Sequence, residues 1–227
     1  MITVLYEDNH IIAVRKQPGD LVQSDRTGDE TLADEVKAYI KVKYKKPGDV
    51  FLGIVHRIDR PVGGIVIFAR TSKALARLNK MFQEKTIKKT YWAIVQSKPP
   101  LEDGTIVHYM KKNQEKNKSR GYDEEVKGSK RAELDYLLVG RSKNYYYLEI
   151  KPKTGRHHQI RVQLSKIGCH IKGDVKYGAN RTNRDGSIHL HARMLEFEHP
   201  VKKEPITIKC DPPSDPLWDE MRGLAAQ

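Results

Sequence analysis

One carboxylate, Asp59, lies in a short segment whose residue types could support nucleophilic or acid–base chemistry. Arg57 and Arg60 flank it, and Pro61 and the pair Gly63–Gly64 follow. Adjacent cations favour the ionised form of a carboxylate, and an ionised aspartate can act as a nucleophile or a general base. Taken alone, the same residues also fit a surface ion pair in a turn, which contributes roughly 0–1 kcal/mol to stability.

The residues after Asp59 predict a stiff loop that leads into a buried strand. Pro61, Gly63 and Gly64 are typical of a tight turn. Residues 65–69 begin with a short, β-branched and uninterrupted apolar run, and this pattern predicts a buried strand. We therefore expect Asp59 in the loop that leads into the N-terminal end of a buried strand, which is an unusual place for an ordinary surface acid.

A second group of chemically useful side chains lies in residues 153–164. Apolar residues at helical spacing predict a helix over 160–167, and Arg161 leaves that helix in a different direction from its apolar stripe. His157 and His158 are expected to point apart, because adjacent positions of a helix do not face one site.

The composition indicates a soluble globular protein whose partner is a polyanion. The chain has 42 Lys and Arg against 29 Asp and Glu, and its formal net charge is +13. An excess of this sign most often indicates nucleic acid. A solubility device or attraction to a membrane surface is the alternative explanation.

The cysteines and the apolar runs point to a cytoplasmic protein. Cys169 and Cys210 have no metal-like spacing, and two thiols make no disulfide framework. The first eight residues carry acids where a signal peptide carries basic residues, and no apolar run approaches the roughly 18–20 residues that span a bilayer. We expect no metal, no membrane association and a monomer.

Periodicity predicts an alternation of strands with a few helices. A capping box at Thr31–Asp34 begins one helix, Ser72 caps a second, and a short helix surrounds Trp218. Residues 4–10 are read as a polar turn, and 97–130 as irregular, with a long loop or flexible hairpin over 111–130. The remaining predicted strands are 11–14, 88–95, 132–140, 144–152, 188–197 and 205–209.

Four separated blocks resemble, in the right order, the RluA-type pseudouridine synthases. Residues 56–64 resemble the family's His-Arg-(Leu/Ile)-Asp-Arg loop, and 89–93 resemble its Lys-x-Tyr-x-Ala strand. Residues 154–162 and 173–178 resemble its Thr-Gly-Arg-x-His-Gln-(Leu/Ile)-Arg segment and the following loop, and 190–200 its last block. Together these blocks cover nearly the whole chain. The sequence departs from the family pattern at Val62–Gly63 and at His157. These differences are expected to affect the shape of the loop and the choice of substrate rather than the reaction.

The resemblance implies isomerisation of uridine to pseudouridine in ribosomal or transfer RNA, with no metal or cofactor. Asp59 would be the catalytic carboxylate, whether by attack or by proton abstraction. Tyr91 would stack on the uracil and help to remove the C5 proton, although strand packing alone also explains this tyrosine. Arg161 would pair with Asp59, and Arg57 would fill the gap left by the extruded base. The expected RNA-binding residues are Arg57, Arg60, Arg156 and His158.

The fold implied by the resemblance is α+β, with a mixed, mostly antiparallel sheet in two lobes, flanking helices and a central active-site cleft. We expect one catalytic domain over 1–227. Many members of the family carry a small S4-like RNA-binding domain ahead of the catalytic one. Because the first strand is expected near residue 4, we expect that domain to be absent here.

Two other functions fit parts of the sequence. A basic RNA-binding protein of the same fold could lack activity, but Asp59, Tyr91 and Arg161 are all present. A metal-dependent nuclease could use several histidines, and an activity assay with a chelator separates this function from the synthase. The histidines in question are His157, His170, His189 and His191.

Overall fold

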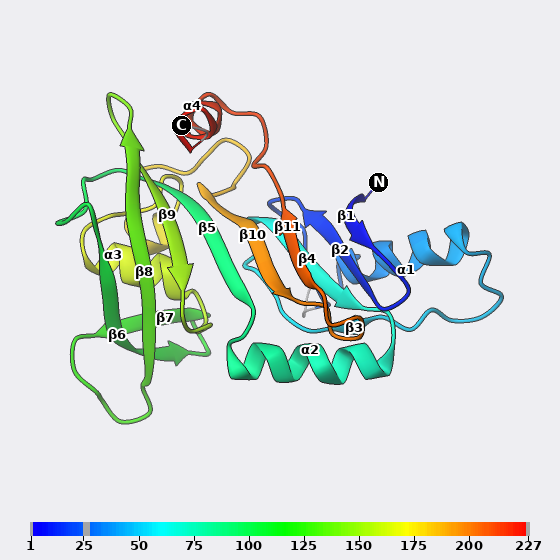
Figure 1. The fold of residues 1–227 in the computed structure, drawn as a ribbon. Helices are drawn as coiled ribbons and strands as arrows, with labels where there is room; N and C mark the ends of the chain where they lie inside the picture. Colours follow the sequence, from blue (N-terminus) through cyan, green and yellow to red (C-terminus); the bar gives the residue numbers. More distant parts are fainter. Residues whose placement is uncertain (1, 25–27, 226–227) are drawn as a thin grey trace. The chain divides into compact units, whose positions relative to one another are not determined.

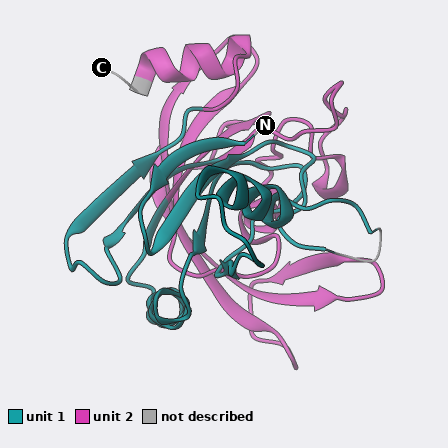
Figure 2. Ribbon diagram, turned by 90° about the vertical axis from the view of Figure 1, so that its right-hand side faces the viewer, with its two compact units in different colours: residues 1–89, 192–211 teal, residues 90–191, 212–227 magenta. Residues whose placement is uncertain are grey.

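The computed structural model describes residues 2–24 and 28–225, which form two compact units. One unit holds the described residues up to 89 together with 192–211, and the other holds 90–191 together with 212–225 (Figure 2). Each unit combines antiparallel strands with helices, so the prediction of an α+β fold with a mostly antiparallel sheet and flanking helices is confirmed. A single domain over 1–227 and a central cleft stay predictions.

The first unit is built on a sheet that contains the apolar run after Asp59. Its elements are β1 (Thr3–Glu7), β2 (Ile11–Lys16), α1 (Leu32–Lys43), β3 (Gly53–Ile54), β4 (Gly63–Ala69), α2 (Ser72–Glu84), β10 (Leu190–Glu198) and β11 (Pro205–Lys209). The strand order is β1-β2-β4-β10, with β3 paired to β4 and β11 paired to β10 (Figure 1). All seven residues of β4 are buried, which confirms the buried strand predicted from 65–69.

The helices of the first unit begin at side-chain caps. Thr31 and Asp34 form the predicted capping box, in which the Thr31 hydroxyl accepts from the Asp34 backbone N–H. The second helix is capped by Thr71 rather than by Ser72, because the Thr71 Oγ1 accepts from the Ala74 N–H at 3.1 Å. Ser72 is instead the first helical residue.

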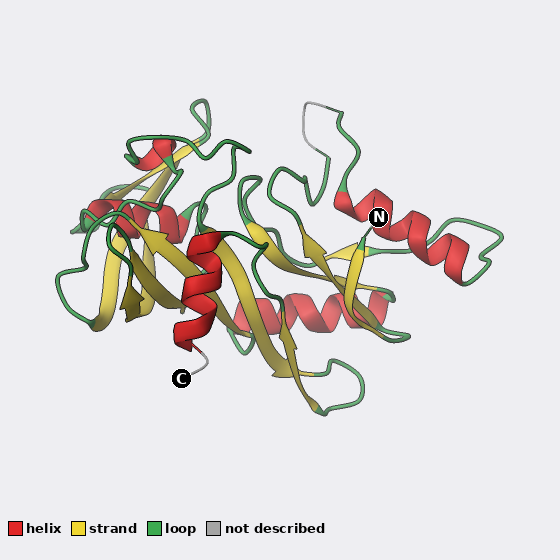
Figure 3. Cartoon of the chain, turned by 90° about the horizontal axis from the view of Figure 1, so that it is seen from above, coloured by secondary structure: helices red, strands yellow, loops and turns green. Residues whose placement is uncertain are grey.

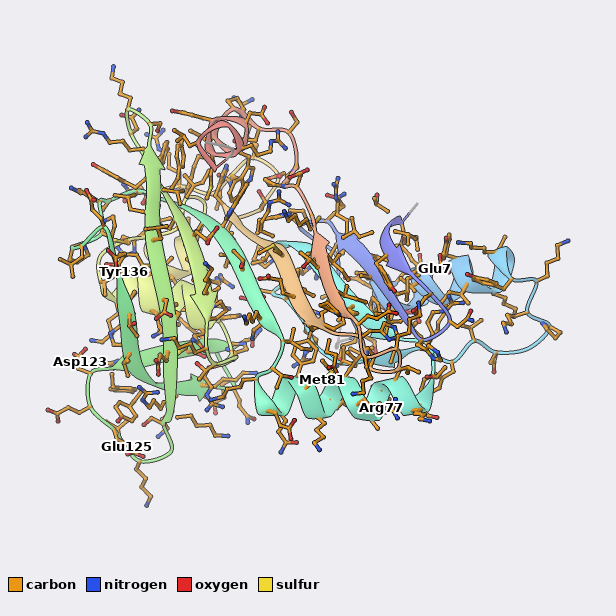
Figure 4. The ribbon with its side chains drawn as sticks, viewed as in Figure 1. Glu7, Arg77, Met81, Asp123, Glu125 and Tyr136 are labelled. Atoms are coloured by element: carbon orange, nitrogen blue, oxygen red, sulfur yellow. The ribbon has the colours of Figure 1, made fainter. Side chains whose placement is uncertain are left out.

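Helix α2 covers one face of the first unit's sheet. Ala74 and Leu78 are fully buried and pack in one cluster with Ile65 and Ile67 of β4. The helices are red in Figure 3, and Met81, labelled on α2 in Figure 4, packs against the same cluster. This packing fixes the strand that follows the Asp59 loop.

The strand expected near residue 4 is present as β1, so the polar turn predicted over 4–10 occupies only the second half of that range. Residues 3–7 are mostly β-branched or aromatic and form β1, in which Val4 lies opposite Val14 of β2. The turn is confined to residues 8–10, where the Asp8 carboxylate accepts from the His10 and Ile11 N–H groups at 2.8 and 2.9 Å. Asp8 therefore makes by itself the turn that the prediction spread over seven residues.

The second unit is an antiparallel sheet with the strand order β5-β9-β8-β6-β7. Its elements are β5 (Lys88–Val95), β6 (Asp103–Asn113), β7 (Lys118–Tyr122), β8 (Lys130–Arg141), β9 (Tyr146–Pro152), α3 (Gln159–Lys166), the 3-10 helix η1 (Val175–Tyr177) and α4 (Pro216–Ala225). The strands predicted at 88–95, 132–140 and 144–152 and the helices near 160–167 and Trp218 are confirmed.

The prediction that 97–130 is irregular is wrong, and the hairpin alternative for 111–130 holds. Strand β6 buries every second residue at Ile106, His108 and Met110, and β7 pairs with its second half. The outward residues Thr105, Val107 and Tyr109 are themselves strand formers, and the pattern is interrupted by charged residues only from Lys111 on. Among the described residues, no helix is long and apolar enough to cross a membrane.

Candidate active site

Asp59 lies in the first unit, in the loop between β3 and β4. Its carbonyl accepts from the Val62 N–H at 3.0 Å, which closes a four-residue turn. Ile58 and Val62, on either side, are buried, while Asp59 itself is half-buried. The loop is thus anchored by apolar side chains on both sides of the carboxylate, as the tight-turn prediction requires.

The backbone of this turn is hydrogen-bonded to a buried ammonium group, which was not predicted from the sequence. Lys16 is 1% exposed, and its Nζ donates to three carbonyls, those of Gln17 at 3.0 Å, Arg60 at 3.0 Å and Val62 at 2.8 Å. Burial lowers the pKa of Lys16 to about 8. Three carbonyl acceptors use all three hydrogens of the ammonium, so Lys16 ties the end of β2 to the residues after Asp59.

Replacing this lysine should loosen the loop. Lys16→Met keeps the length of the side chain but leaves buried carbonyls without their donor, and we expect it to lower the unfolding free energy by about 1–3 kcal/mol. Urea denaturation followed by circular dichroism measures the change. The exposed Lys41→Met on α1 is the matched control, and an equal midpoint in the two variants would contradict the role given to Lys16.

Two further residues fix the backbone around the turn. The His56 Nε2 accepts from the Ile67 N–H at 3.0 Å, its ring stacks on Phe82, and burial lowers the pKa of His56 to about 3. His56 is therefore neutral, with its proton on Nδ1. Gly64 has a φ of +124°, and a Cβ there would lie 2.4–2.7 Å from atoms of Ala192. Only glycine fits this position.

The two arginines beside Asp59 are used differently. The Arg60 Nε donates to the Gly19 carbonyl at 3.0 Å, and its Nη2 pairs with Asp29 at 3.1 Å. Arg57 is exposed, and within residues 2–24 and 28–225 its guanidinium makes no hydrogen bond or ion pair. Arg60 thus braces the neighbouring turn, whereas Arg57 is available to an external anion.

Tyr91 lies in the second unit, near the start of β5 and opposite Ile150 of β9. Its neighbour Trp92 is buried and packs with Trp218 of α4. Because successive side chains of a strand point to opposite faces, the half-buried Tyr91 lies on the face of β5 away from Trp92. Both interpretations of Tyr91 made from the sequence, packing within the strand and stacking on the uracil, stay predictions.

Arg161, in the first turn of α3, makes a buried ion pair that the sequence reading did not predict. Its Nε and Nη2 donate to the two oxygens of Asp174 at 2.7 and 2.8 Å, and the two side chains are 5% and 2% exposed. The guanidinium also lies 5.0 Å above the ring of Tyr177. Such a two-point pair orients the guanidinium firmly. Pairing of Arg161 with Asp59 stays a prediction.

The residues before α3 form a network around Tyr177. The Tyr177 hydroxyl accepts from the Ser119 N–H at 2.9 Å and is hydrogen-bonded to the His158 Nδ1 at 2.7 Å. Burial, with Arg161 nearby, lowers the pKa of His158 to about 2, so the ring is neutral. The Arg156 Nε donates to the Arg131 carbonyl at 3.1 Å. RNA binding by Arg156 and His158 stays a prediction.

The prediction that His157 and His158 point apart is wrong. Both residues precede α3, and His158 has a left-handed backbone with a φ of 55°. This conformation brings the two rings into a stack with centroids 3.7 Å apart.

The other histidines considered for a metal site have other contacts. His170 is hydrogen-bonded to the Tyr177 carbonyl, and His189 stacks on Trp218. Across the described residues, no group of three or more His, Cys, Asp or Glu side chains is placed to hold a metal ion.

Comparison with known proteins places these residues in one family. Residues 10–166 match the family described as RNA pseudouridylate synthase. A tRNA pseudouridine synthase C of Pectobacterium carotovorum subsp. carotovorum is 30% identical over 253 residues, which cover 100% of this chain and 62% of that protein. A ribosomal large subunit pseudouridine synthase D of Zymomonas mobilis is 30% identical, with 94% of this chain and 70% of that protein covered.

The fold agrees with this placement. The solved structure of human RNA pseudouridylate synthase domain containing 4 has a TM-score of 0.79 and 21% identity, and the match covers 97% of this chain and 92% of that one. This chain spans less than two thirds of the length of the Pectobacterium protein, at 62%. Because the family match covers well over half of the chain and agrees with the relatives, the chain belongs to the RNA pseudouridylate synthase family.

Proposed function

We propose that this chain isomerises uridine to pseudouridine within RNA, with Asp59 as the catalytic carboxylate. The observation that carries the proposal is the construction of the Asp59 turn, in which a buried ammonium, a neutral histidine and a glycine position one half-buried acid. An acid held at this structural cost in a member of this family has a chemical role rather than a surface one. No cofactor is invoked, because the reaction rearranges bonds within one nucleotide.

The proposed reaction breaks the bond between uracil N1 and ribose C1′ and forms a bond between C5 and the same C1′. The C5 proton is lost and N1 gains one, so the atoms balance. Asp59 acts in its ionised form, by attack or by proton abstraction. Tyr91 is proposed to stack on the uracil and to assist loss of the C5 proton. Arg161, held rigid by Asp174, is proposed to support the carboxylate.

The substrate is proposed to be structured transfer or ribosomal RNA. The relatives' names include both a transfer RNA and a large ribosomal subunit enzyme, so both classes are candidates. The net charge of +13 favours a polyanion. We also propose a monomer that works in the cytoplasm, in keeping with Cys169 and Cys210, which are buried and unlinked. Sedimentation at micromolar concentration tests the monomer.

Tritium release from RNA labelled at uracil C5 tests the reaction. Bulk transfer RNA and bulk ribosomal RNA are incubated separately with the protein, each with and without a chelator. Release from one pool would establish the isomerase and its substrate class together. Tight binding without release from either pool would favour an inactive RNA-binding protein of the same fold, and release abolished by the chelator would favour metal-dependent chemistry.

Arg57→Ala should slow the step in which the uridine leaves its stack. Arg57 is exposed beside Asp59, and unstacking a base costs a few kcal/mol, so loss of a side chain that fills the gap should slow single turnover on structured RNA about tenfold. An unstructured oligonucleotide containing the same uridine is the control, because its base is already unstacked. Equal rates for wild type and variant on structured RNA would contradict the role of Arg57.

A further inference from the structure

The hairpin formed by β6 and β7 presents a strongly basic face. Lys111 of β6 lies directly opposite Arg120 of β7, and Asn113 lies opposite Lys118. Since side chains two residues apart share a face of a strand, these four project from the same side of the hairpin. All four are exposed. Their buried neighbours, Ser119 among them, point to the other side.

The pairing of Lys111 with Arg120 is unfavourable in the isolated protein. Like charges directly opposite on two strands destabilise the pair, and within the described residues neither side chain forms an ion pair with an acid. Among the described residues, Lys111 Nζ hydrogen-bonds only the Lys127 carbonyl, at 3.0 Å, and the Arg120 guanidinium lies 5.2 Å above the ring of Tyr122. An external anion between Lys111 and Arg120 would turn this repulsion into attraction.

Two hollows of about 580 Å³ each border this hairpin, and both are lined by cations. They share Lys118, Ser119 and Arg120. Neither lining contains an aspartate or a glutamate. The basic lining residues of the two hollows are Lys111, Lys112, Lys116, Lys118, Arg120, Lys166 and Lys176.

The acids near the hairpin lie outside these hollows. Asp123 and Glu125, labelled in Figure 4, belong to the loop that joins β7 to β8. Asp123 pairs with Lys166 at 2.8 Å, so Lys166 is partly neutralised. Glu115 is at the exposed tip of the hairpin. Lys118 lies 5.3 Å above the ring of Tyr177, and in the described part of the chain no acid pairs with Lys111, Lys118 or Arg120, so their charge is available to another molecule.

Hydrogen bonds fix the hairpin to the segment that carries Arg161. The His157 ring bonds the Ser119 Oγ at 2.8 Å and the Asn117 Oδ1 at 3.1 Å. Ser119 also donates its backbone N–H to the Tyr177 hydroxyl. His157 is a residue at which this chain departs from the family pattern. A molecule bound on the hairpin is thus held in a defined position relative to Arg161.

We propose that the exposed face of the β6–β7 hairpin binds the phosphate backbone of the substrate RNA. This inference rests on the proposed function, because it assigns a surface to the same RNA. The face offers separated cations with lysine and arginine donors and no competing acid, which suits a chain of phosphates rather than one bound ion. It contributes affinity and position, and it takes no part in bond exchange.

The double variant Lys111→Gln/Arg120→Gln tests the proposal. Binding of the labelled RNA pool is measured by filter retention at several salt concentrations. Each lost phosphate contact lowers the slope of log affinity against log salt by about 0.7–0.9, so we expect a decrease of about 1.5.

Two matched variants separate this surface from general charge. Lys37→Gln/Lys41→Gln on α1 removes the same two charges and should leave the salt slope unchanged. Lys111→Arg/Arg120→Lys keeps the charges and should retain the wild-type slope. The thermal unfolding midpoint of each variant verifies the fold, and the Gln pair should be no less stable than wild type because it removes a like-charge pair.

The outcomes distinguish this surface from the reaction. An unchanged slope for the Lys111 and Arg120 Gln pair, with active wild type, overturns the hairpin proposal and leaves the proposed function standing. An equal decrease in the α1 control also overturns it, because net charge alone would then explain the effect. A selective decrease without tritium release from wild type supports the surface and counts against the isomerase.

Discussion

Asp59→Asn is expected to abolish turnover while leaving the affinity for RNA within several-fold of wild type. Asparagine has nearly the same shape, so the turn closed by the Val62 N–H, and the contacts of Lys16 beneath it, should persist. It lacks the negative charge and the nucleophilic oxygen. A single acid–base group contributes about 10²–10⁴-fold, and a covalent role would make the loss larger.

Tritium release and filter binding, measured on the same RNA, separate chemistry from affinity in this variant. Asp49→Asn makes the same chemical change at an exposed residue of the same unit and should keep full activity. A near-normal rate for Asp59→Asn would show that another group performs the chemistry. Loss of both binding and activity would mean that Asp59 maintains the structure of the loop and takes no part in the reaction.

Local patterns were sufficient to predict most of the strands. The run after Asp59 and the segment 88–95 are apolar, β-branched or aromatic for several residues, and both form strands close to the predicted bounds. These residues have one stable environment, the inside of a sheet, so neighbours in sequence determine the outcome. The capping box at Thr31 is likewise local, because both partners lie within one helical turn.

The second half of β6 and the whole of β7 could not be found in the same way, although residues 105–110 carry a strand pattern. Their outward positions carry Lys111, Lys118 and Arg120, which lower the apolar content to that of a loop. The remaining signal, burial at Ile106, His108 and Met110, includes a histidine that a hydrophobicity pattern does not count. The exposed basic residues of the hairpin therefore obscure the strand pattern of the segment that carries them.

The contacts that support the candidate catalytic residues could not be predicted from the sequence either. Asp59 and Arg161 were identified by the resemblance, but the Lys16 ammonium reaches carbonyls of residues 44 and 46 positions away. The Asp174 partner of Arg161 lies 13 residues along the chain, with no periodicity to link them. Charged groups become buried only where distant parts of the chain supply all their partners, and no local pattern records this.

Asp174→Ala is expected to destabilise the second unit strongly. Removing one partner of a buried, two-point ion pair typically costs 3–5 kcal/mol, so we expect a loss of about that size. Arg161 is 5% exposed and cannot turn to solvent without opening α3. Urea denaturation followed by fluorescence reports on this unit, because both tryptophans, Trp92 and Trp218, lie in its core.

A matched control and a double variant complete this test. Asp123→Ala removes an acid that also pairs with a cation, Lys166, but is 77% exposed, so little change is expected. Arg161→Met/Asp174→Leu replaces both charges with apolar groups and should recover most of the stability, because the buried charge is gone. Recovery of folding without tritium release would separate the structural role of the pair from the proposed role of Arg161 in the reaction. Equal midpoints for Asp174→Ala and Asp123→Ala would show instead that water reaches the pair.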